Sequence, residues 1–313
     1  MLRLTRFKAL LVATLILVAV VSMISPVFLT TRNFLNILEQ LSINAIVAAG
    51  MTFVIIAAGI DLSVGSILAL GSMGTAGLLV SGIPVPAAMV GGVLVGVAAG
   101  AVNGVAVAYG RIPAFIMTLG MLNVARGTVM FLTSGNSIVG FPETFLFLGK
   151  GRIGPIPVLV LITAAVYLVG HLVLVKTRFG RYTFAIGNDP ETARRLGVRV
   201  KRHQFLLYAL SGGLASFAGI LLAARLNSAL TLAGTGAELD VIAAVVIGGT
   251  SLYGGRGSMP GTLLGVIFFQ IVRNALNILG ISVFVQQVAV GALLIFSALA
   301  DFLYDRWGRQ EGS

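Results

Sequence analysis

Charged side chains are scarce in this sequence of 313 residues. Only 10% of its residues are Asp, Glu, Lys or Arg, whereas 58% are apolar and the mean hydropathy is +1.03. A soluble domain carries about 25% charged residues, so these few charges cannot cover a water-facing surface around a core of this size. The composition therefore disfavours a soluble enzyme, a nucleic-acid-binding protein and a disordered chain.

Cysteine is absent, and histidine occurs only at His171 and His203. The lack of cysteine excludes disulfides and thiolate metal sites. Neither histidine belongs to an H-E-x-x-H motif, and two distant histidines alone cannot assemble a metal site. We expect no metal, and we expect His203 to lie at a basic membrane edge.

Nucleotide-binding motifs are also missing. No G-x-x-x-x-G-K-[ST] occurs, because none of the four lysines lies in that frame, and the glycines of 248–262 do not match the dinucleotide fingerprint. We therefore expect neither a cofactor nor catalytic residues, and no ATP-hydrolysing site in the chain itself.

Long apolar runs fill the sequence instead. A membrane-spanning helix needs about 20 mostly apolar residues, and ten runs qualify as spans, near 9–29, 37–59, 62–80, 87–109, 113–132, 156–175, 204–225, 238–253, 258–279 and 283–304. The first run follows basic residues as in a signal peptide, but it lacks a small-residue cleavage site, so we expect it to be retained. The eighth is short and glycine-rich, so we expect it to be broken or re-entrant. The sequence predicts an all-α polytopic membrane protein with one transmembrane domain over residues 1–313.

Basic residues set the orientation, because cytoplasmic loops are enriched in Lys and Arg. With the N-terminus inside, the cytoplasmic set comprises Arg3, Arg6, Lys8, Arg111, eight residues in 176–203, Arg256, Arg306 and Arg309. The outer loops hold only Arg32, Lys150 and Arg152. Ten crossings would also place the C-terminus in the cytoplasm, so the net charge of +11 is mainly a topology signal.

Two stripes of small residues predict close helix packing. One consists of Gly92, Gly96, Gly100 and Gly104, and the other of Ser211, Ala215, Gly219 and Ala223. Four-residue spacing places each set on one helical face, where a neighbouring backbone can approach.

Two short polar breaks interrupt the apolar runs. The first is GIDLSVGS (59–66), in which Asp61 or Ser63 can cap the following helix. The second is GGTSLYGGRGSMPGT (248–262), in which Ser258 can cap with Pro260 in the first turn. Residues 55–66 and 242–258 resemble each other as apolar runs that end in such a break. The first break is either a capped turn at the cytoplasmic membrane edge or a pore-lining segment that helps form a gate.

Amides predominate among the polar residues inside the spans. Such residues must face the bundle interior or a wet cavity. Taken singly, each is explained by a helix-to-helix hydrogen bond, but together they indicate a polar path for a neutral, hydroxyl-rich solute. The candidates for this path or its gate are Asp61, Ser63, Asn44, Asn123 and Gln286.

The segment 176–203 carries eight basic and two acidic residues. Asn188 or Asp189 can cap a helix that begins at Pro190, and Gly197 can end it. A basic loop over anionic lipid would explain the charge alone. The short capped helix, with Ala193 and Leu196 on it, also suits docking into a groove of a soluble partner.

Four segments carry a family resemblance: 50–66, 111–127, 187–198 and 238–262. In that order they resemble permease subunits of bacterial ATP-binding-cassette (ABC) importers, in particular the ribose, xylose and arabinose type. The resemblance implies a multi-pass protein of the bacterial cytoplasmic membrane that translocates a pentose-like sugar. It also implies three partners, namely a second permease subunit, a cytoplasmic ATPase that binds the ATP, and an extracytoplasmic sugar-binding protein.

The same resemblance assigns coupling to the ATPase to residues within 176–203. The matching positions are Asn188, Asp189, Glu191, Ala193, Arg194 and Gly197. Thr192 and Ala58 depart from the family pattern, in which an alanine and a glycine respectively are common, so the roles of individual residues stay open.

Other functions remain open at this stage. Related importers carry branched-chain amino acids, nucleosides or autoinducers. A proton-coupled secondary transporter would use Asp61 or Glu39 as its proton site, and a passive channel would need no partner. A lipid-modifying enzyme would need a catalytic cluster, which we do not find. The sequence does not choose the solute, or between a homodimer and a heterodimer.

Overall fold

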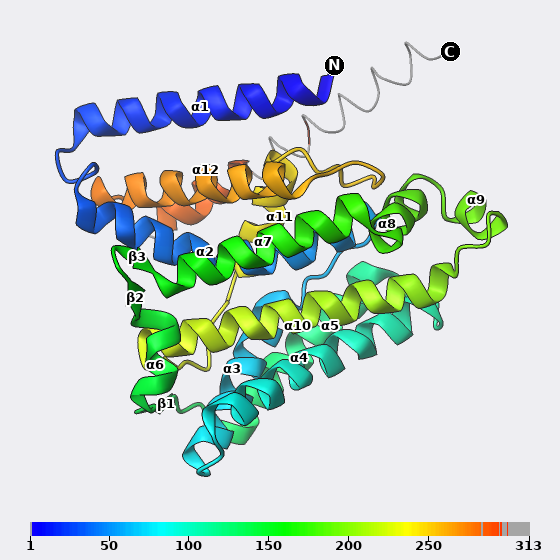
Figure 1. Cartoon of the computed structure of the whole chain (residues 1–313), viewed down its shortest axis with the longest axis horizontal. Coiled ribbons are helices and arrows are strands. Elements are labelled where there is room, and N and C mark those ends of the chain that lie inside the picture. The colour runs from blue at the N-terminus through cyan, green and yellow to red at the C-terminus, as the bar shows by residue number, and fades with distance from the viewer. Residues whose placement is uncertain (1, 283, 294, 296–298, 300–313) are drawn as a thin grey trace.

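The computed structural model describes residues 2–282, 284–293, 295 and 299. It is an all-α structure in which most long helices lie side by side along one direction (Figure 1). Short strands and a small helix cap one end, and two short helices project at the other. The N-terminal end of the first helix points toward the end with the projecting helices, as the predicted orientation requires.

In the part of the chain that the structure describes, seven helices are long and apolar enough to cross a membrane. They are α1 (Leu2–Ile24), α2 (Thr31–Ile56), α4 (Val85–Ala108), α5 (Ala114–Thr133), α7 (Val158–Lys176), α10 (Val200–Leu226) and α12 (Met259–Ile278). They confirm the polytopic all-α class. The last predicted span, 283–304, and the C-terminus fall partly or wholly outside the described residues, apart from a short apolar helix at Phe284–Leu293.

The two polar breaks adjoin short helices, as their glycines suggest. After the first break, α3 (Val64–Val80) has 17 residues, and before the second, α11 (Ala237–Ile247) has 11. An 11-residue helix is about 16 Å long, roughly half the hydrocarbon thickness. The prediction of a broken eighth span is therefore confirmed, because α11 ends at Ile247 and residues 248–258 form a loop.

The segment 133–155, expected only as a long connection, carries its own structure. It contains β1 (Ile138–Val139), α6 (Glu143–Lys150) and β2 (Arg152–Ile153). β1 pairs antiparallel with β4 (Ser228–Ala229), and β2 pairs antiparallel with β3 (Ile156–Pro157). These ladders lie at the end opposite to the predicted cytoplasmic loop (Figure 1).

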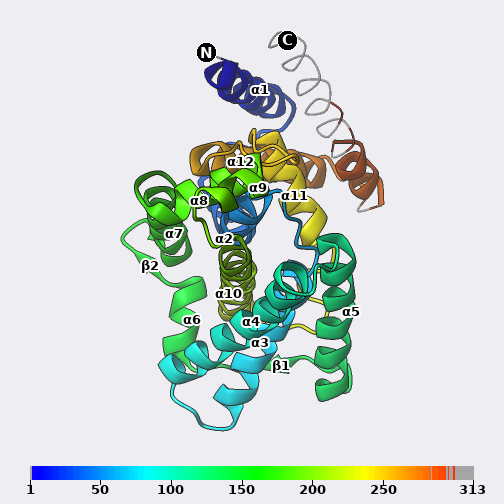
Figure 2. The same cartoon turned by 90° about the vertical axis from the view of Figure 1, so that its right-hand side faces the viewer.

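The glycine stripe on α4 packs directly on α10, as predicted. A Cβ at Gly96 would lie 2.5 Å from the Gly212 carbonyl oxygen, and one at Gly100 would lie 2.2 Å from that of Tyr208. Any larger side chain would push the two backbones apart. Seen from one end, α10 lies at the centre of the bundle with α2 and α4 beside it (Figure 2).

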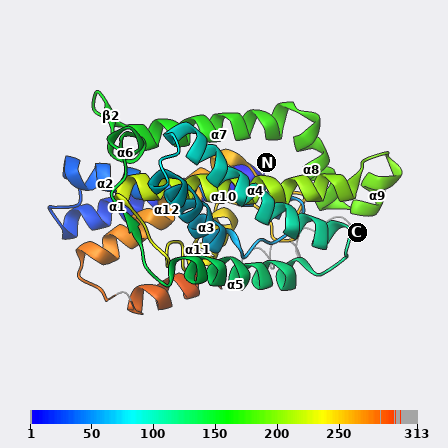
Figure 3. The ribbon, with the colours of Figure 1, turned by 90° about the horizontal axis from the view of Figure 1, so that it is seen from below.

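The second stripe turns α10 toward α3. A Cβ at Gly219 would lie 2.0 Å from the Leu68 carbonyl oxygen, and Ala215 is fully buried. Helices α5 and α7 lie along opposite edges of the bundle (Figure 3). Many apolar side chains on the outer helices are exposed, such as Leu15 and Leu168, which suits contact with lipid.

Candidate functional site

Most of the predicted cytoplasmic loop is helical. Between α7 and α10 the chain forms α8 (Arg178–Asn188) and α9 (Pro190–Arg195). The sequence predicts only the second of these helices. The Thr177 side chain accepts from the Gly180 amide and caps α8, and Phe179 packs edge-on against Phe53 with ring centroids 5.9 Å apart. α8 therefore folds back onto the bundle and supports α9.

His203 lies in the first turn of α10, directly after the basic residues Lys201 and Arg202, but its ring points into the protein. Its side chain is buried, its Nε2 lies 2.9 Å from the Thr183 hydroxyl, and its ring centroid lies 4.4 Å from that of Phe179. It joins the start of α10 to α8, which makes it part of the support for the projecting helices.

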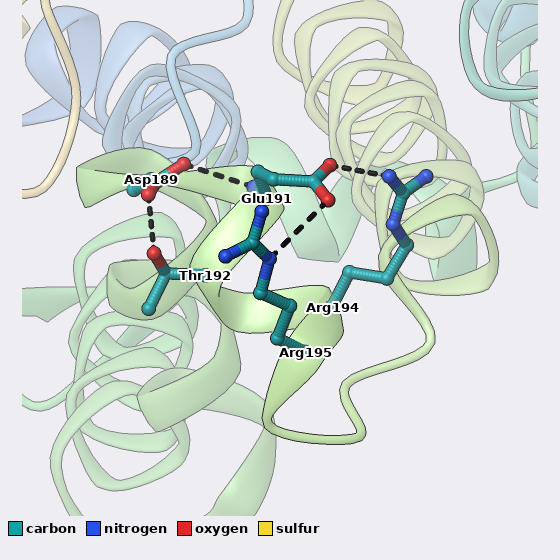
Figure 4. Close-up of polar contacts among 5 residues, drawn as sticks. All are labelled: Asp189, Glu191, Thr192, Arg194 and Arg195. Carbon is teal, nitrogen blue, oxygen red and sulfur yellow. Dashed lines mark hydrogen bonds and ion pairs between the residues drawn. The ribbon is translucent and has the colours of Figure 1, made fainter.

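Asp189 caps α9 as the sequence predicts. Its Oδ1 accepts from the Glu191 amide at 2.9 Å, and its Oδ2 accepts from the Thr192 hydroxyl (Figure 4). These two bonds, the Thr192 bond above all, hold the pKa of the Asp189 carboxyl below its ordinary value. Pro190 occupies the first helical position, where its missing amide hydrogen costs nothing.

Glu191 fastens the outer face of α9. Its carboxylate pairs with the Arg194 guanidinium and lies 3.7 Å from the Arg195 Nε (Figure 4). The bond from Arg194 raises the pKa of that guanidinium. The six-residue helix is thus held by its own side chains.

Gly197 ends α9 in a Schellman motif. The Gly197 amide donates to Arg194, the Val198 amide donates to Ala193, and the φ of Gly197 is +85°. Ala193 is 2% exposed and faces inward, whereas Leu196 is 79% exposed at the tip. The surface available for docking is therefore the tip with Leu196, and Ala193 positions it from below.

The C-terminal end of α8 contacts, at one point, the two segments that contain the polar breaks. The Gly255 amide donates to the Ile56 carbonyl at 2.8 Å. A Cβ at Gly187 would lie 1.8 Å from that carbonyl oxygen, and one at Gly254 would lie 2.8 Å from the Ala58 Cβ. We call Ile56, Ala58, Gly187, Gly254 and Gly255 the glycine junction. It joins the two segments that resemble each other in sequence to the cytoplasmic helices.

Asn188, the last residue of α8, completes this junction. A Cβ at Gly255 would lie 2.0 Å from its Oδ1, so its side chain covers the loop rather than capping α9. The sequence singled out Asn188, but not Gly187, Gly254 or Gly255. The sequence shows only that these three residues are glycines, and a turn alone would explain a glycine at each position.

Asp61 lies in a buried cluster inside the bundle. Its carboxylate accepts from the Ser63 amide and hydroxyl and, at 2.8 Å, from the Ser211 hydroxyl near the middle of α10. The Asn103 amide donates to the Ser63 hydroxyl at 2.9 Å. Asp61 and Ser63 are fully buried, so this first break is not an exposed turn at the membrane edge.

The cap predicted for α3 takes a different form. Ser63 precedes the helix but makes no side-chain cap bond, because its hydroxyl donates to Asp61 instead. The sequence predicts Ser211 as a packing position, and it does not indicate that Ser211 and Asn103 join the Asp61 cluster. Their contacts span 150 and 40 residues of sequence respectively.

A polar cavity of about 310 Å³ lies in the half of the bundle nearer the strands. It brings together Asn44 of α2 and Gln286, two of the candidates, and adds Gln40, Gln270 and Asn277. The amides pair across it, with Gln270 donating to Gln40 and Gln286 donating to Asn277, each at 2.8 Å. We call this space the outer polar cavity.

Two ion pairs border the outer polar cavity. Arg273 of α12 lies 2.7 Å from Asp240 of α11, and Arg225 of α10 lies 3.3 Å from Glu39 of α2. Asp240, in the first turn of α11, therefore also makes an ion pair to a neighbouring helix. Asn123 is not brought to this cavity, because it is exposed on α5 and donates to the Leu119 carbonyl of its own helix.

No group of three or more potential metal-ligating side chains occurs in the part of the chain that the structure describes. The arrangement instead offers a preformed cytoplasmic tip, a backbone junction beneath it, a buried carboxylate and an amide-lined cavity. Such a set suits a protein that moves a solute through its bundle.

Comparison with known proteins agrees with this arrangement. The family described as "Branched-chain amino acid transport system / permease component" matches residues 33–298. The ribose import permease of Escherichia coli K12 is 46% identical over 93% of this chain and 92% of its own length. That of Bacillus subtilis 168 is 43% identical over 91% and 89% respectively. The D-allose transport system permease of E. coli K12 is 39% identical over 93% and 90%.

No solved structure matches the chain. The family and the membrane helices agree on a transporter subunit that lies, multi-pass, in the bacterial inner membrane. Since the family match covers most of the described residues, the chain belongs to the permease-component family of the branched-chain amino acid transport system.

Proposed function

We propose that this chain is the permease subunit of an ABC importer for a pentose-like monosaccharide. The outer polar cavity supports a neutral solute, because its amides donate and accept hydrogen bonds and its charges are paired with each other. Its volume of about 310 Å³ suits a small ligand. The similar permeases named for ribose and D-allose support a sugar over an amino acid.

α9 is the coupling helix to a cytoplasmic ATPase in this proposal. The single observation that carries it is the glycine junction beneath the preformed tip. A push on Leu196 is transmitted through Asn188 and Gly187 to the Ile56 carbonyl and the Gly255 amide. Because packed backbones shift between discrete arrangements, this contact can switch both breaks together.

Movement of the first break reaches the buried cluster directly. Asp61 lies five residues beyond Ile56 and holds Ser211 of α10. α10 in turn packs backbone to backbone on α4 through the glycine contacts, so a shift of α10 is passed on to α4. The switch would open the outer polar cavity to one side of the membrane at a time.

Three partners complete the proposed machine. A second permease subunit, identical or homologous, forms the dimer, and an ATPase binds the ATP at the cytoplasmic face. An extracytoplasmic binding protein delivers the sugar at the end with the short strands.

The test is reconstitution in proteoliposomes with the ATPase and the binding protein encoded beside this gene. We expect ATP-dependent uptake of labelled ribose or a related pentose, and no uptake of leucine. Uptake of leucine but no sugar would overturn the substrate class. Uptake by the lone chain under a proton gradient would overturn the coupling to ATP.

A further inference from the structure

A groove with a cationic rim lies beside α9, on the cytoplasmic side. Its volume is about 760 Å³, and it lies between the end of α4, α9 and the start of α10. Its lining includes five basic residues, namely Arg111, Arg194, Arg199, Lys201 and Arg202. Leu196 does not line it, so the groove and the tip of α9 are separate surfaces. We call it the cytoplasmic groove.

Most of its charge has no counter-ion. Arg194 pairs with Glu191, the one acidic residue in the lining. Among the residues that the structure describes, Arg111, Lys201 and Arg202 make no ion pair. The Lys201 Nζ lies 5.8 Å from the centre of the Tyr109 ring, which ties the start of α10 to the end of α4. This leaves a concentrated positive charge that favours an anion.

The apolar part of the groove continues onto the lipid-facing side of α4. Val105 of this helix and Tyr109, its C-cap, are each 51% exposed, and Ile112, just beyond them, is 41% exposed. Tyr109 and Ile112 also line the groove. A ligand that fits both parts has an anionic head and an apolar tail.

The depth of the groove agrees with such a ligand. α10 has 27 residues, which span about 40 Å, whereas the hydrocarbon core is about 30 Å thick. α10 thus exceeds the core by about 10 Å, and the two cations Lys201 and Arg202 in its first turn suit the headgroup layer on the predicted cytoplasmic side.

We propose that the cytoplasmic groove binds the phosphate headgroup of an anionic phospholipid. The phosphate lies among Arg111, Lys201 and Arg202. The acyl chains run along Val105 of α4 and along Ile112, which follows that helix. Glu191 and Arg194 line the same groove, so the bound lipid lies against the coupling helix. The existence of this lipid site does not depend on which solute the chain transports, so this proposal is independent of the proposed function.

The experiment is native mass spectrometry of the full chain in mild detergent. It is titrated with dioleoyl phosphatidylglycerol, with dioleoyl phosphatidylcholine and, in a separate arm, with inorganic phosphate. We expect one phosphatidylglycerol per chain to be retained far more strongly than phosphatidylcholine. The triple variant Arg111→Gln/Lys201→Gln/Arg202→Gln is expected to lose on the order of 100-fold in that affinity, since each cation near an anionic surface contributes.

The matched control is Lys176→Gln/Arg178→Gln/Arg181→Gln. It removes the same charge from exposed positions outside the groove, and it should retain the lipid. The single variants Arg111→Gln and Lys201→Gln, each expected to weaken binding about fivefold, replace the triple variant if that one does not fold. Equal loss in the control, equal retention of the two lipids, or displacement of phosphatidylglycerol by equimolar inorganic phosphate would overturn the proposal.

Discussion

Replacing Gly187 by alanine tests whether the glycine junction transmits movement. The added Cβ would lie 1.8 Å from the Ile56 carbonyl oxygen and 2.5 Å from the Gly255 nitrogen. Both neighbours are backbone atoms, so no side-chain rotation relieves the clash. Ordinary contact lies near 3.5 Å, so the segments must separate by about 1.5 Å.

That separation breaks the bond from the Gly255 amide to Ile56, which is 2.8 Å long in the native chain. Overpacking of this kind costs about 1–3 kcal/mol, and the hydrogen bond contributes about 1 kcal/mol more. We expect Gly187→Ala to lower the free energy of unfolding by about 2–4 kcal/mol. The helix tip itself, with Leu196 and its caps, is untouched.

The assay compares sugar uptake per ATP hydrolysed in proteoliposomes with hydrogen exchange at the Gly255 amide. We expect the uptake ratio to fall at least tenfold while the ATPase still binds, and the Gly255 amide to lose protection. The control is Gly127→Ala in α5, where no atom lies within 4 Å of the added Cβ and alanine favours the helix by about 1 kcal/mol. If Gly187→Ala matches this control in both measurements, the junction does not carry the coupling.

Three further predictions concern α9 and the buried cluster. Gly197→Ala forces alanine into a left-handed conformation, which costs roughly 1–2 kcal/mol. This variant and Glu191→Gln should each lower uptake per ATP while the ATPase still binds in part. Unchanged uptake in both variants would contradict the coupling assignment. Asp61→Asn replaces a carboxylate that only accepts hydrogen bonds with an amide that also donates, so uptake should fall while a pull-down still recovers the ATPase; full uptake would contradict a gating role. Because the pKa of Asp189 is lowered in the folded chain, its cap is fully present above the unfolded pKa of about 3.9 and is lost only as the pH falls through the lower folded value. Hydrogen exchange in α9, corrected for its intrinsic pH dependence, should therefore show constant protection from pH 8 to pH 5, and a loss beginning near pH 6 would contradict this reasoning.

Local chemistry explains why α9 could be predicted from the sequence. The cap at Asp189, the proline after it and the glycine at 197 act within one or two turns, and the structure places each where the pattern indicates. The glycine stripe on α4 is equally local, because four-residue spacing sets one face of a helix. Its contact with α10 then follows from the need to bury that face against another backbone.

Partners distant in sequence could not be predicted in this way. A helix in lipid has no polar outward face. The sequence therefore does not show whether an amide on that helix faces inward or outward. Asn44 and Asn123 therefore look alike in sequence, yet the first lines the outer polar cavity and the second is exposed on α5. α8 was missed for a related reason, since its support comes from Phe53 and His203, which belong to other helices.

The positions of the acidic residues give a structural reason for the scarcity of charge. Six of the seven in the described part lie at, or just before, the first turn of a helix: Asp61, Glu143, Asp189, Glu191, Glu238 and Asp240. There a carboxylate offsets the unpaired amides and the positive end of the helix dipole. α3 and α11 begin inside the bundle and have no side-chain cap bond, so the nearby carboxylates act through their charge on the positive end of the helix dipole.

Glu39 is the exception, because it lies within α2, away from either end, and pairs with Arg225 of α10. No helix end explains its charge, and a pair of charges inside a membrane bundle is costly to keep. The pair borders the outer polar cavity and joins α2 to α10. The glycine junction connects α2 to the breaks, and the Asp61 cluster connects α10 to the first break. The position of the pair therefore favours a role in the moving part of the bundle over a role in holding the fold.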